Sequence, residues 1–294
     1  MRIPTEKLSM LTHCSRRDGT APGTDSAQLY RDMVLYTFAT EIRAGFFIAY
    51  YRNFAIPSIA KTLAARGETA ARPMKRSYDT GIVIHELIVN GFDSDRGQKM
   101  LDLLRRVHQG VPGSGEDFLY PLLTLLVIPL RWIDAHGWRK LTARERDAAL
   151  EFYTELGARM GLEVPVPATF AEAAALMDDY ESRHMAASPE GAQLLDATAA
   201  ALAVRLPRPL KSKTTAVIAL LMDKPEIVPA LGLEPAPAWL RRVFHAVLKI
   251  RAVIARTRPV PTRPSFIPGT SGSSVYPKGY TLDQIGPWGK SANV

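Results

Sequence analysis

The stretch FLYPLLTLLVIPL, residues 118–130, is one of the two longest apolar runs in the chain, and it decides the class of fold. It is shorter than the roughly 20 residues that a helix needs to cross a bilayer, and it contains two prolines. The run therefore predicts a helix buried inside a protein. The other run, AGFFIAYY at 44–51, is shorter still and predicts a second buried helix.

Helical patterns extend outward from these two runs over residues 26–255. Thr142 and Glu145 have the spacing of a capping box, in which each side chain bonds the other's backbone N–H. Strand alternation, β-hairpin signals and short-period repeats are missing from the sequence, so we expect an all-α protein. The expected helices include 57–67, 77–91, 93–110, 142–161, 169–186 and 188–207.

The expected organisation is a single helical domain between two non-helical ends. Residues 1–25 are polar and rich in small side chains, and predict a loose arm. Residues 26–256 form the helical domain. Residues 257–294 are rich in proline and glycine, and predict an extended tail. The aromatic residues of YPKGYTLDQIGPW, 276–288, indicate that this tail packs back onto the body.

The chain is basic, with 37 Lys and Arg against 29 Asp and Glu. Much of the excess lies in 241–263, which could contact anionic lipid or nucleic acid. The simpler interpretation is a solvated helix that Val243, Val247, Ile250 and Ile254 pack onto the body. Because no recognition-helix or RNA-binding signature accompanies the charge, we expect no nucleic-acid partner.

The location of the protein is predicted only coarsely. The first 20 residues contain no apolar signal core, and the single cysteine, Cys14, excludes an intramolecular disulfide and CxxC metal sites. We therefore expect a cytoplasmic protein without a transmembrane helix. Peripheral contact with a membrane stays open.

His108, in the run LLRRVHQG at 103–110, raises the main functional question. On a helix it shares a face with Leu101 and Leu104, and would point into the protein. Two interpretations stay open at this point: a core histidine bonded to a carbonyl, or a metal or haem ligand. Walker A, GxGxxG and GxSxG motifs do not occur, so P-loop, Rossmann and acyl-hydrolase functions have no support.

The remaining histidines do not form a convincing metal site, because HxxxH, ExxH and HxH do not occur. Asp178, Glu181 and His184 recur at intervals of three residues and could form a carboxylate–histidine cluster. The alternative is that they belong to a solvated helix face.

Two motifs together resemble a known family. KRSYDT at 75–80 is followed by RRVHQG at 105–110, and the order Arg76-xxx-Thr80 then RxxH resembles the haem b oxygenases of the MpaB/latex-clearing-protein family. YYRNFAIPSIAKTLAARGE, AWLRRV and YPKGYTLDQIGP also look like its MpaB branch. The resemblance covers about residues 30–288.

The resemblance implies roles for five residues. His108 would be the proximal iron ligand of haem b, and Arg105 a partner of a haem propionate. Arg76 and Thr80 would lie on the distal side, where an arginine can polarise dioxygen or peroxide. Asp79 would be a further polar group there, or a helix N-terminal acid favoured by the dipole.

The sequence also departs from the rubber-cleaving relatives. Asp79 stands where they carry a lysine that can be a distal ligand, and Ala60 where they carry a glutamate base; the nearest upstream glutamate is Glu68. The expected activity is oxidation of a hydrophobic substrate by dioxygen or peroxide, with cleavage of an isoprenoid or lipid C=C bond as one form. The alternatives are a non-catalytic binding protein or haem sensor, and a basic surface-docking protein.

Overall fold

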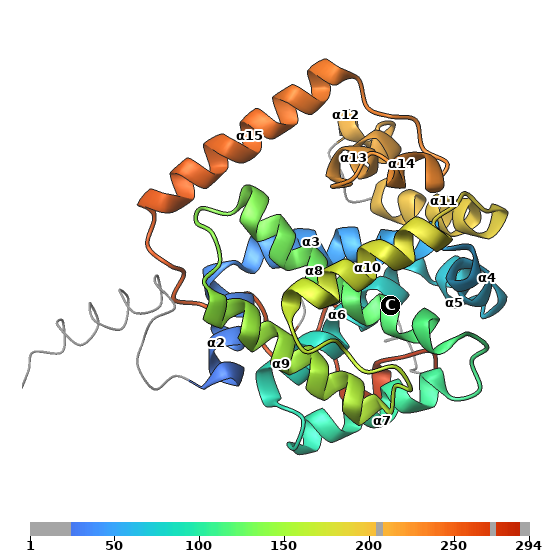
Figure 1. The fold of residues 1–294 in the computed structure, drawn as a ribbon, viewed down its shortest axis with the longest axis vertical. Coiled ribbons are helices and arrows are strands. Elements are labelled where there is room, and N and C mark those ends of the chain that lie inside the picture. Colours follow the sequence, from blue (N-terminus) through green and yellow to red (C-terminus); the bar gives the residue numbers. More distant parts are fainter. Residues whose placement is uncertain (1–24, 204–207, 271–274, 289–294) are drawn as a thin grey trace, which may run out of the picture.

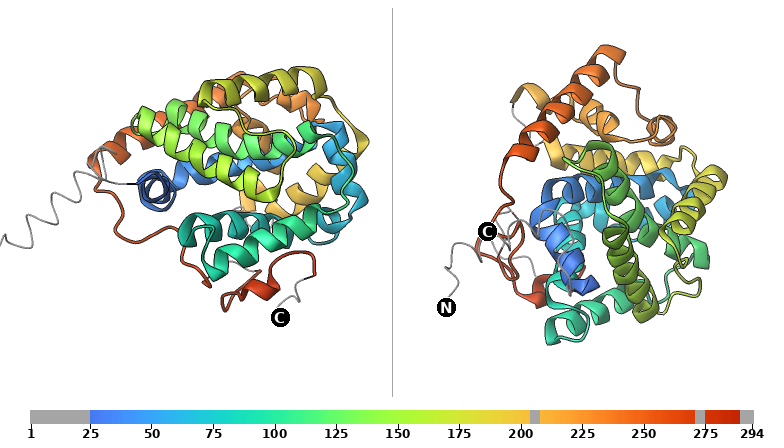
Figure 2. Two further views of the ribbon diagram at one scale, coloured as in Figure 1. Left: turned by 60° about the horizontal axis from the view of Figure 1, so that its bottom comes forward. Right: turned by 60° about the vertical axis from the view of Figure 1, so that its left-hand side comes forward.

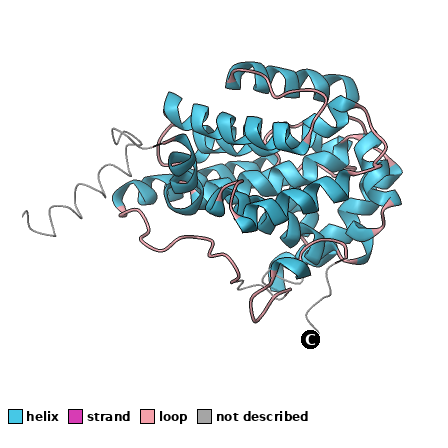
Figure 3. Cartoon of the chain, turned by 90° about the horizontal axis from the view of Figure 1, so that it is seen from below, coloured by secondary structure: helices cyan, strands magenta, loops and turns pink. Residues whose placement is uncertain are grey.

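The structure, a computed structural model, describes residues 25–203, 208–270 and 275–288, and these are helices joined by loops without a strand (Figure 3). The expected all-α class is confirmed; the arm at 1–25 lies almost wholly outside the described residues. The helices are α2 (Ser26–Asp32), the π-helical η1 (Met33–Thr37), α3 (Ala39–Arg52), the 3-10 helix η2 (Asn53–Ala55), α4 (Pro57–Ala65), α5 (Glu68–Ala71), α6 (Pro73–Asn90), α7 (Asp95–His108), α8 (Gly115–His136), α9 (Ala143–Met160), α10 (Phe170–His184), α11 (Pro189–Ala203), α12 (Arg208–Lys211), α13 (Thr214–Leu221), α14 (Ile227–Ala230), α15 (Ala238–Thr257) and the 3-10 helix η3 (Leu282–Gln284).

The two apolar runs form α8 and most of α3, and these helices lie side by side in the middle of the fold (Figure 1). They are in close contact at Gly45 and Pro129, where a Cβ on Gly45 would lie 2.3 Å from the Cα of Pro129. Among the described residues, α8 alone is long and apolar enough to cross a membrane, and 67% of its apolar window is buried. The burial agrees with a core helix, as the sequence predicts.

Local signals in the sequence set several helix ends. Ser114, Thr142 and Thr169 each close a capping box at the start of a long helix, including the one predicted at Thr142 and Glu145. Helix α6 ends at Gly91, whose φ of 73° is readily reached only by glycine. These caps fix where the helices that surround α8 begin and end.

The buried side chains form two hydrophobic clusters. The larger joins α2, α3, α6, α7, α8, α9 and α10, and the smaller joins the end of α3 to α11, α13 and α14. The guanidinium of Arg52 lies at the boundary, fully buried, and forms ion pairs with Glu181 of α10 and Asp223 after α13. The two carboxylates that neutralise this one buried cation therefore tie the two clusters together.

Helix α15 extends along the outer edge of the fold (Figures 1 and 2). The expectation that Val243, Val247, Ile250 and Ile254 pack it onto the body is wrong, because these side chains are between 44% and 60% exposed. Phe244 and Leu248 make the contact with the core instead. The helix is rotated so that its most regular apolar stripe faces outward.

The chain beyond α15 is extended and runs back over the body, as its composition predicts (Figure 3). Tyr276 and Tyr280 are buried in the main cluster, together with Ile285. Helix α15 ends at Thr257, where this extended segment begins.

Replacement of Gly45 by alanine tests the close contact between α3 and α8. The added methyl group would overlap backbone and side-chain atoms of Pro129, so we expect Gly45→Ala to lower the free energy of unfolding by about 2 kcal/mol. Gly81 of α6 is the matched control, because a Cβ there meets nothing within 4 Å. Gly81→Ala is expected to leave stability unchanged or raise it by up to about 1 kcal/mol. Urea unfolding measures both; equal effects would contradict the packing argument.

Candidate functional site

His108 is the last residue of α7. One nitrogen of its imidazole is hydrogen-bonded, and the other has no hydrogen-bond partner among the described residues. Its Nδ1 lies 2.7 Å from the carbonyl oxygen of Leu104, one turn earlier, so Nδ1 carries the proton and donates it. Nε2 has no hydrogen-bond partner among the described residues. In a neutral ring with this tautomer, the lone pair of Nε2 is free to bind a metal or accept a proton.

The surroundings of His108 differ from those of the leucines on the same helix face. Leu101 is fully buried and Leu104 is partly buried, whereas His108 is exposed. Desolvation nevertheless lowers the pKa of His108, so many protein atoms surround an imidazole that solvent can reach. The expectation that this imidazole points into the interior is wrong, because the side chain is exposed at the end of α7. The partly enclosed surroundings of the His108 ring, with Arg66 and Phe118, are called the hollow.

Two arginines reach this hollow. The charges of Arg76 and Arg66 both lower the pKa of His108, which keeps the imidazole neutral. Arg66 follows α4 and donates from Nη1 to the carbonyl oxygen of Val107 at 2.8 Å. The edge of the Phe118 ring faces His108 with 6.2 Å between the ring centres. The family resemblance implied that Arg76 lies on the distal side of a haem, and the sequence gave no signal that the end of α4 would meet the end of α7.

Arg76 and Thr80 lie one turn apart on α6 and interact directly. Nη1 of Arg76 donates to Oγ1 of Thr80, and Oγ1 in turn donates to the carbonyl oxygen of Arg76 at 2.9 Å. Both side chains are half-buried, and Arg76 has no carboxylate partner among the described residues. The pair is thus a polarised hydroxyl held by a cation that no carboxylate in the described part of the chain neutralises.

Tyr50 of α3 adds a polar atom that the sequence did not single out. Its Oη is buried and makes no hydrogen bond within the described residues. Burial raises the pKa of this phenol, while Ser77, Arg76 and Thr69 act in the opposite direction. A buried hydroxyl without a partner is costly, and this one lies beside Arg76. It is therefore a candidate to bond a ligand that also reaches Arg76.

Asp79 has a structural role, which corrects both of its expected roles. Its carboxylate is buried and accepts hydrogen bonds from Lys75 Nζ at 2.5 Å, Tyr276 Oη at 2.6 Å and the Gly286 N–H at 2.9 Å. Asp79 also lies beyond the first turn of α6, which begins at Pro73, so the helix dipole does not explain it. It fastens the C-terminal tail to α6.

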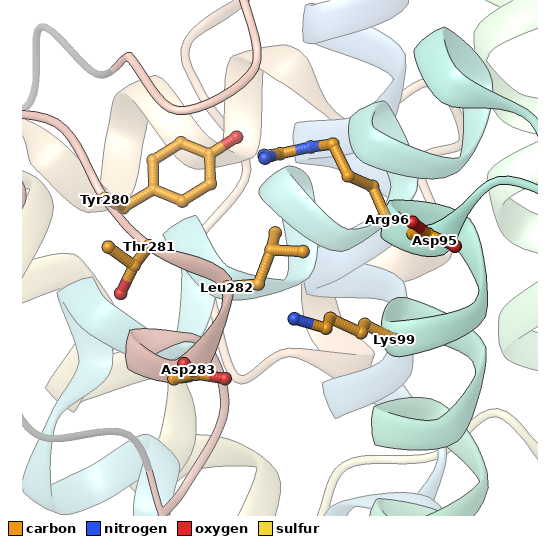
Figure 4. A pocket seen from close by; sticks show the side chains of 7 residues that line it. All are labelled: Asp95, Arg96, Lys99, Tyr280, Thr281, Leu282 and Asp283. Carbon is orange, nitrogen blue, oxygen red and sulfur yellow. The ribbon is translucent and has the colours of Figure 1, made fainter.

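A second carboxylate of α6, Glu86, holds the next part of the tail. Tyr280 Oη donates to it at 2.5 Å, and Arg96 of α7 donates to both of its oxygens. Beside this cluster, Arg96, Lys99 and Tyr280 line an open pocket of about 300 Å³ (Figure 4). Lys99 and His108 are nine residues apart on α7, about 14 Å along the axis, so the pocket is separate from the hollow.

The contacts of Arg105 differ from the expected propionate role. Its Nε donates to the carbonyl oxygen of Arg159 at 2.9 Å, and its Nη1 to the carboxylate of Asp102 at 3.2 Å. These bonds join α7 to the end of α9. Arg66 and Arg76, not Arg105, are the arginines whose charge acts on His108.

Other sequence candidates lie elsewhere. Glu181 is buried against Arg52 and Lys224, and Asp178 pairs with Arg131 and Lys224, so a wholly solvated face was the wrong interpretation for this stretch. His184 instead lies on the Tyr180 ring. The described residues contain no group of three or more His, Cys, Asp or Glu that could hold a metal ion. Ala60 is fully buried, and Glu68 forms an ion pair with Arg72.

His85 of α6 is the nearest competitor to His108 as a ligand. Its Nδ1 bonds the carbonyl oxygen of Gly81 at 2.7 Å in the same way. Its ring, however, packs against Phe46 and Phe266, with 5.8 and 4.9 Å between ring centres. His85 therefore has the environment of a packed core histidine, whereas His108 has that of an open one.

Fold and site together define a helical protein in which an exposed histidine, His108, lies near Arg66 and Arg76, two arginines without a carboxylate partner among the described residues. Comparison with known families names this class more closely. The family described as ER-bound oxygenase mpaB/B'/rubber oxygenase, catalytic domain, matches residues 38–254. The chain belongs to this family.

Individual relatives agree with the assignment. The ER-bound oxygenase mpaB' of Penicillium brevicompactum is 25% identical over 81% of this chain and 72% of its own length. ER-bound oxygenases mpaB of Penicillium roqueforti (strain FM164) and of P. brevicompactum are 29% and 27% identical, over 57% and 71% of this chain. The chain spans 61% and 51% of the length of these two relatives.

A solved structure shows the same fold. The latex clearing protein LCP in its closed state superposes with a TM-score of 0.63 over 90% of this chain and 76% of that one. The identity is 18%, so this likeness concerns the fold alone.

Asp79→Asn tests the attachment of the tail. The change removes the charge that neutralises buried Lys75 and weakens the bonds from Tyr276 and Gly286, so we expect the free energy of unfolding to fall by about 3 kcal/mol. Limited proteolysis should also cut the tail sooner. Asp283→Asn is the control, because Asp283 is an exposed carboxylate of the same tail. A tail as resistant in Asp79→Asn as in Asp283→Asn would contradict the assignment.

Proposed function

We propose that this protein is a haem b-dependent oxygenase that acts on a hydrophobic substrate, with His108 as the iron ligand. The observation that carries the proposal is the state of the His108 imidazole, whose Nδ1 bonds Leu104 while Nε2 has no partner in a hollow open to solvent. Membership of an oxygenase family supports the class of reaction.

The residues around the hollow suit a haem in three respects. A single open histidine without neighbouring carboxylate or thiolate ligands fits haem iron better than a bare metal ion, which needs several protein ligands. Arg66 and Arg76 supply positive charge for propionates or for a polarised oxygen species. The unpaired Oη of Tyr50 offers a further donor. Arg105 has no part in this proposal, because its guanidinium is bonded to α9.

When bound, haem supplies the redox chemistry, and the chain's own residues orient and polarise the reacting groups. His108 is kept neutral by burial and by two nearby cations, so its Nε2 lone pair stays available at neutral pH. The hydroxyl of Thr80 is fixed by Arg76, which holds its remaining oxygen lone pair, an acceptor, at a defined place. The remaining guanidinium donors of Arg76 can stabilise negative charge that develops on oxygen.

The reaction we propose is oxidative cleavage of an isoprenoid or lipid C=C bond by dioxygen. The double bond is replaced by two C=O groups, and each product receives one atom of the same O₂. Atoms and electrons balance without an external reductant. A peroxide-driven oxidation would transfer one oxygen atom and release water, and is distinguished by the oxidant that supports turnover.

The first test is the absorption spectrum. Purified protein, or protein reconstituted with haemin, should show a Soret band, and His108→Ala should lose it because Nε2 is the expected iron ligand. His85→Gln is the matched control, since His85 has the same Nδ1 bond but a packed ring. We expect His85→Gln to keep the band.

Each outcome decides between alternatives. Colourless protein that haemin does not reconstitute would overturn the proposal, and so would a band that survives in His108→Ala but disappears in His85→Gln. A normal band without oxygen uptake on isoprenoid alkenes would favour a haem sensor instead.

Arg76→Gln separates cofactor binding from chemistry. If Arg76 stabilises charge on oxygen, the variant should keep its Soret band while its kcat for oxygen uptake falls about 100- to 1000-fold. The kcat of Thr80→Val should also fall, but by less, because this change leaves the charge of Arg76 in place. Loss of haem from Arg76→Gln would instead assign the arginine to cofactor binding.

A further inference from the structure

Helix α15 leaves an apolar stripe without a partner among the described residues. Trp239, Val243, Val247, Ile250 and Ile254 recur at intervals of three and four residues, so they lie on one face. Their exposed fractions run from 44% for Ile254 to 65% for Trp239. The adjacent face of the helix is the one that holds the body, through Phe244 and Leu248. The stripe is thus not required for packing of α15.

The orientation of α15 on the body is firmly set. Arg251 donates from Nη1 to the buried carboxylate of Glu41 at 2.8 Å, which fixes the middle of the helix on α3. The ring of His245 stacks on His136 at the end of α8, with 5.8 Å between ring centres. Because these contacts fix the rotation of α15, which lies at the outer edge of the fold (Figures 1 and 2), the stripe stays exposed as a consequence of the fold.

A row of cations runs beside the stripe. Arg242, Lys249 and Arg256 recur at intervals of seven residues and are exposed, so they line one side of the helix. By the helical period, this row lies next to the stripe on the side away from the body. The combination of exposed apolar residues, a tryptophan and parallel cations is typical of a helix that lies in a membrane interface.

The distribution of charge decides what this surface fits. Residues 235–282 contain no Asp or Glu and hold eight Lys or Arg, while the other 29 Lys and Arg equal the 29 Asp and Glu of the chain. The whole net charge of +8 therefore belongs to α15 and the tail after it. Two copies that met through this helix would oppose like charges. An anionic surface is complementary to it.

We propose that α15 docks the protein on anionic phospholipid membranes, with the stripe inserted among the lipids and the row of Arg242, Lys249 and Arg256 at the phosphate groups. The inference is independent of haem binding at His108. It would bring the domain to the place where a hydrophobic substrate is dissolved.

The experiment measures sedimentation with vesicles of phosphatidylcholine alone and of an equimolar mixture with phosphatidylglycerol. We expect binding to the mixed vesicles that weakens with salt, little binding to phosphatidylcholine, and a blue shift of tryptophan emission that Trp239→Phe abolishes. Failure to bind the mixed vesicles would overturn the proposal.

Variants separate charge from apolar insertion. Replacement of Arg242, Lys249 and Arg256 by glutamine should reduce partition at least about 100-fold. The matched control replaces three other exposed cations by glutamine: Lys61, Lys140 and Arg144, on or beside α4 and α9. This change should reduce partition to the vesicles far less. Equal losses in the two triple variants would contradict docking through α15.

The stripe is tested by Val247→Ser with Ile250→Ser. Binding should fall at least about tenfold, while the thermal unfolding midpoint and the Soret band stay unchanged because the side chains are exposed. Sedimentation velocity tests the alternative partner, which is a second copy of the chain. A wild-type dimer that this double variant dissociates, without vesicle binding, would assign the stripe to a second copy of the chain and overturn the proposal.

Discussion

The buried guanidinium of Arg52 is the constraint on which the arrangement of the helices depends. It lies at the end of α3 with 0% exposure, and burial of an unpaired charge would cost several kcal/mol. Glu181 and Asp223 neutralise it from α10 and from the segment after α13. Glu181 also accepts a bond from Tyr120 of α8 at 3.1 Å. Four parts of the chain must therefore be in place before this one cation is satisfied.

Two faces of α6 have different roles: one holds the C-terminal tail and α7, and the other carries the residues proposed to act in the reaction. Lys75, Asp79 and Glu86 share the face that binds the tail and α7, because positions four and eleven residues apart lie on one side of a helix. Arg76 and Thr80 lie on an adjacent face, turned toward the hollow. The tail bonds therefore fix the rotation of α6, and with it the direction of the Arg76–Thr80 pair.

Local signals explain how much of this could be predicted from the sequence. The buried helix at 118–130, the cap at Thr142 and the break at Gly91 depend on nearby residues, and the structure confirms them. Lys75 is a local partner of Asp79, but Tyr276 and Gly286 are 197 and 207 residues away in the tail, and Arg66 approaches His108 from another helix. No local pattern encodes such contacts, so Asp79 was misassigned and Arg66 was missed.

The rotation of α15 about its axis is a second feature that the sequence alone does not predict. The helix has two apolar faces, and periodicity alone does not say which one meets the body. The regular stripe at Val243, Val247 and Ile250 is the obvious choice from sequence, yet the body takes Phe244 and Leu248. The Arg251–Glu41 ion pair decides it, because a buried carboxylate on α3 needs a cation.

Four arginines of the chain differ in how their charge is neutralised. Arg52 is paired with two carboxylates and Arg251 with one, and both fix the relative positions of helices. Arg66 and Arg76 have no carboxylate partner among the described residues, and their charge acts on His108. Arg66 is exposed, whereas Arg76 is half-buried, and a half-buried cation without a carboxylate favours an anionic or polarisable ligand from outside. That difference, more than the identity of the residues, separates the proposed site from the supporting structure.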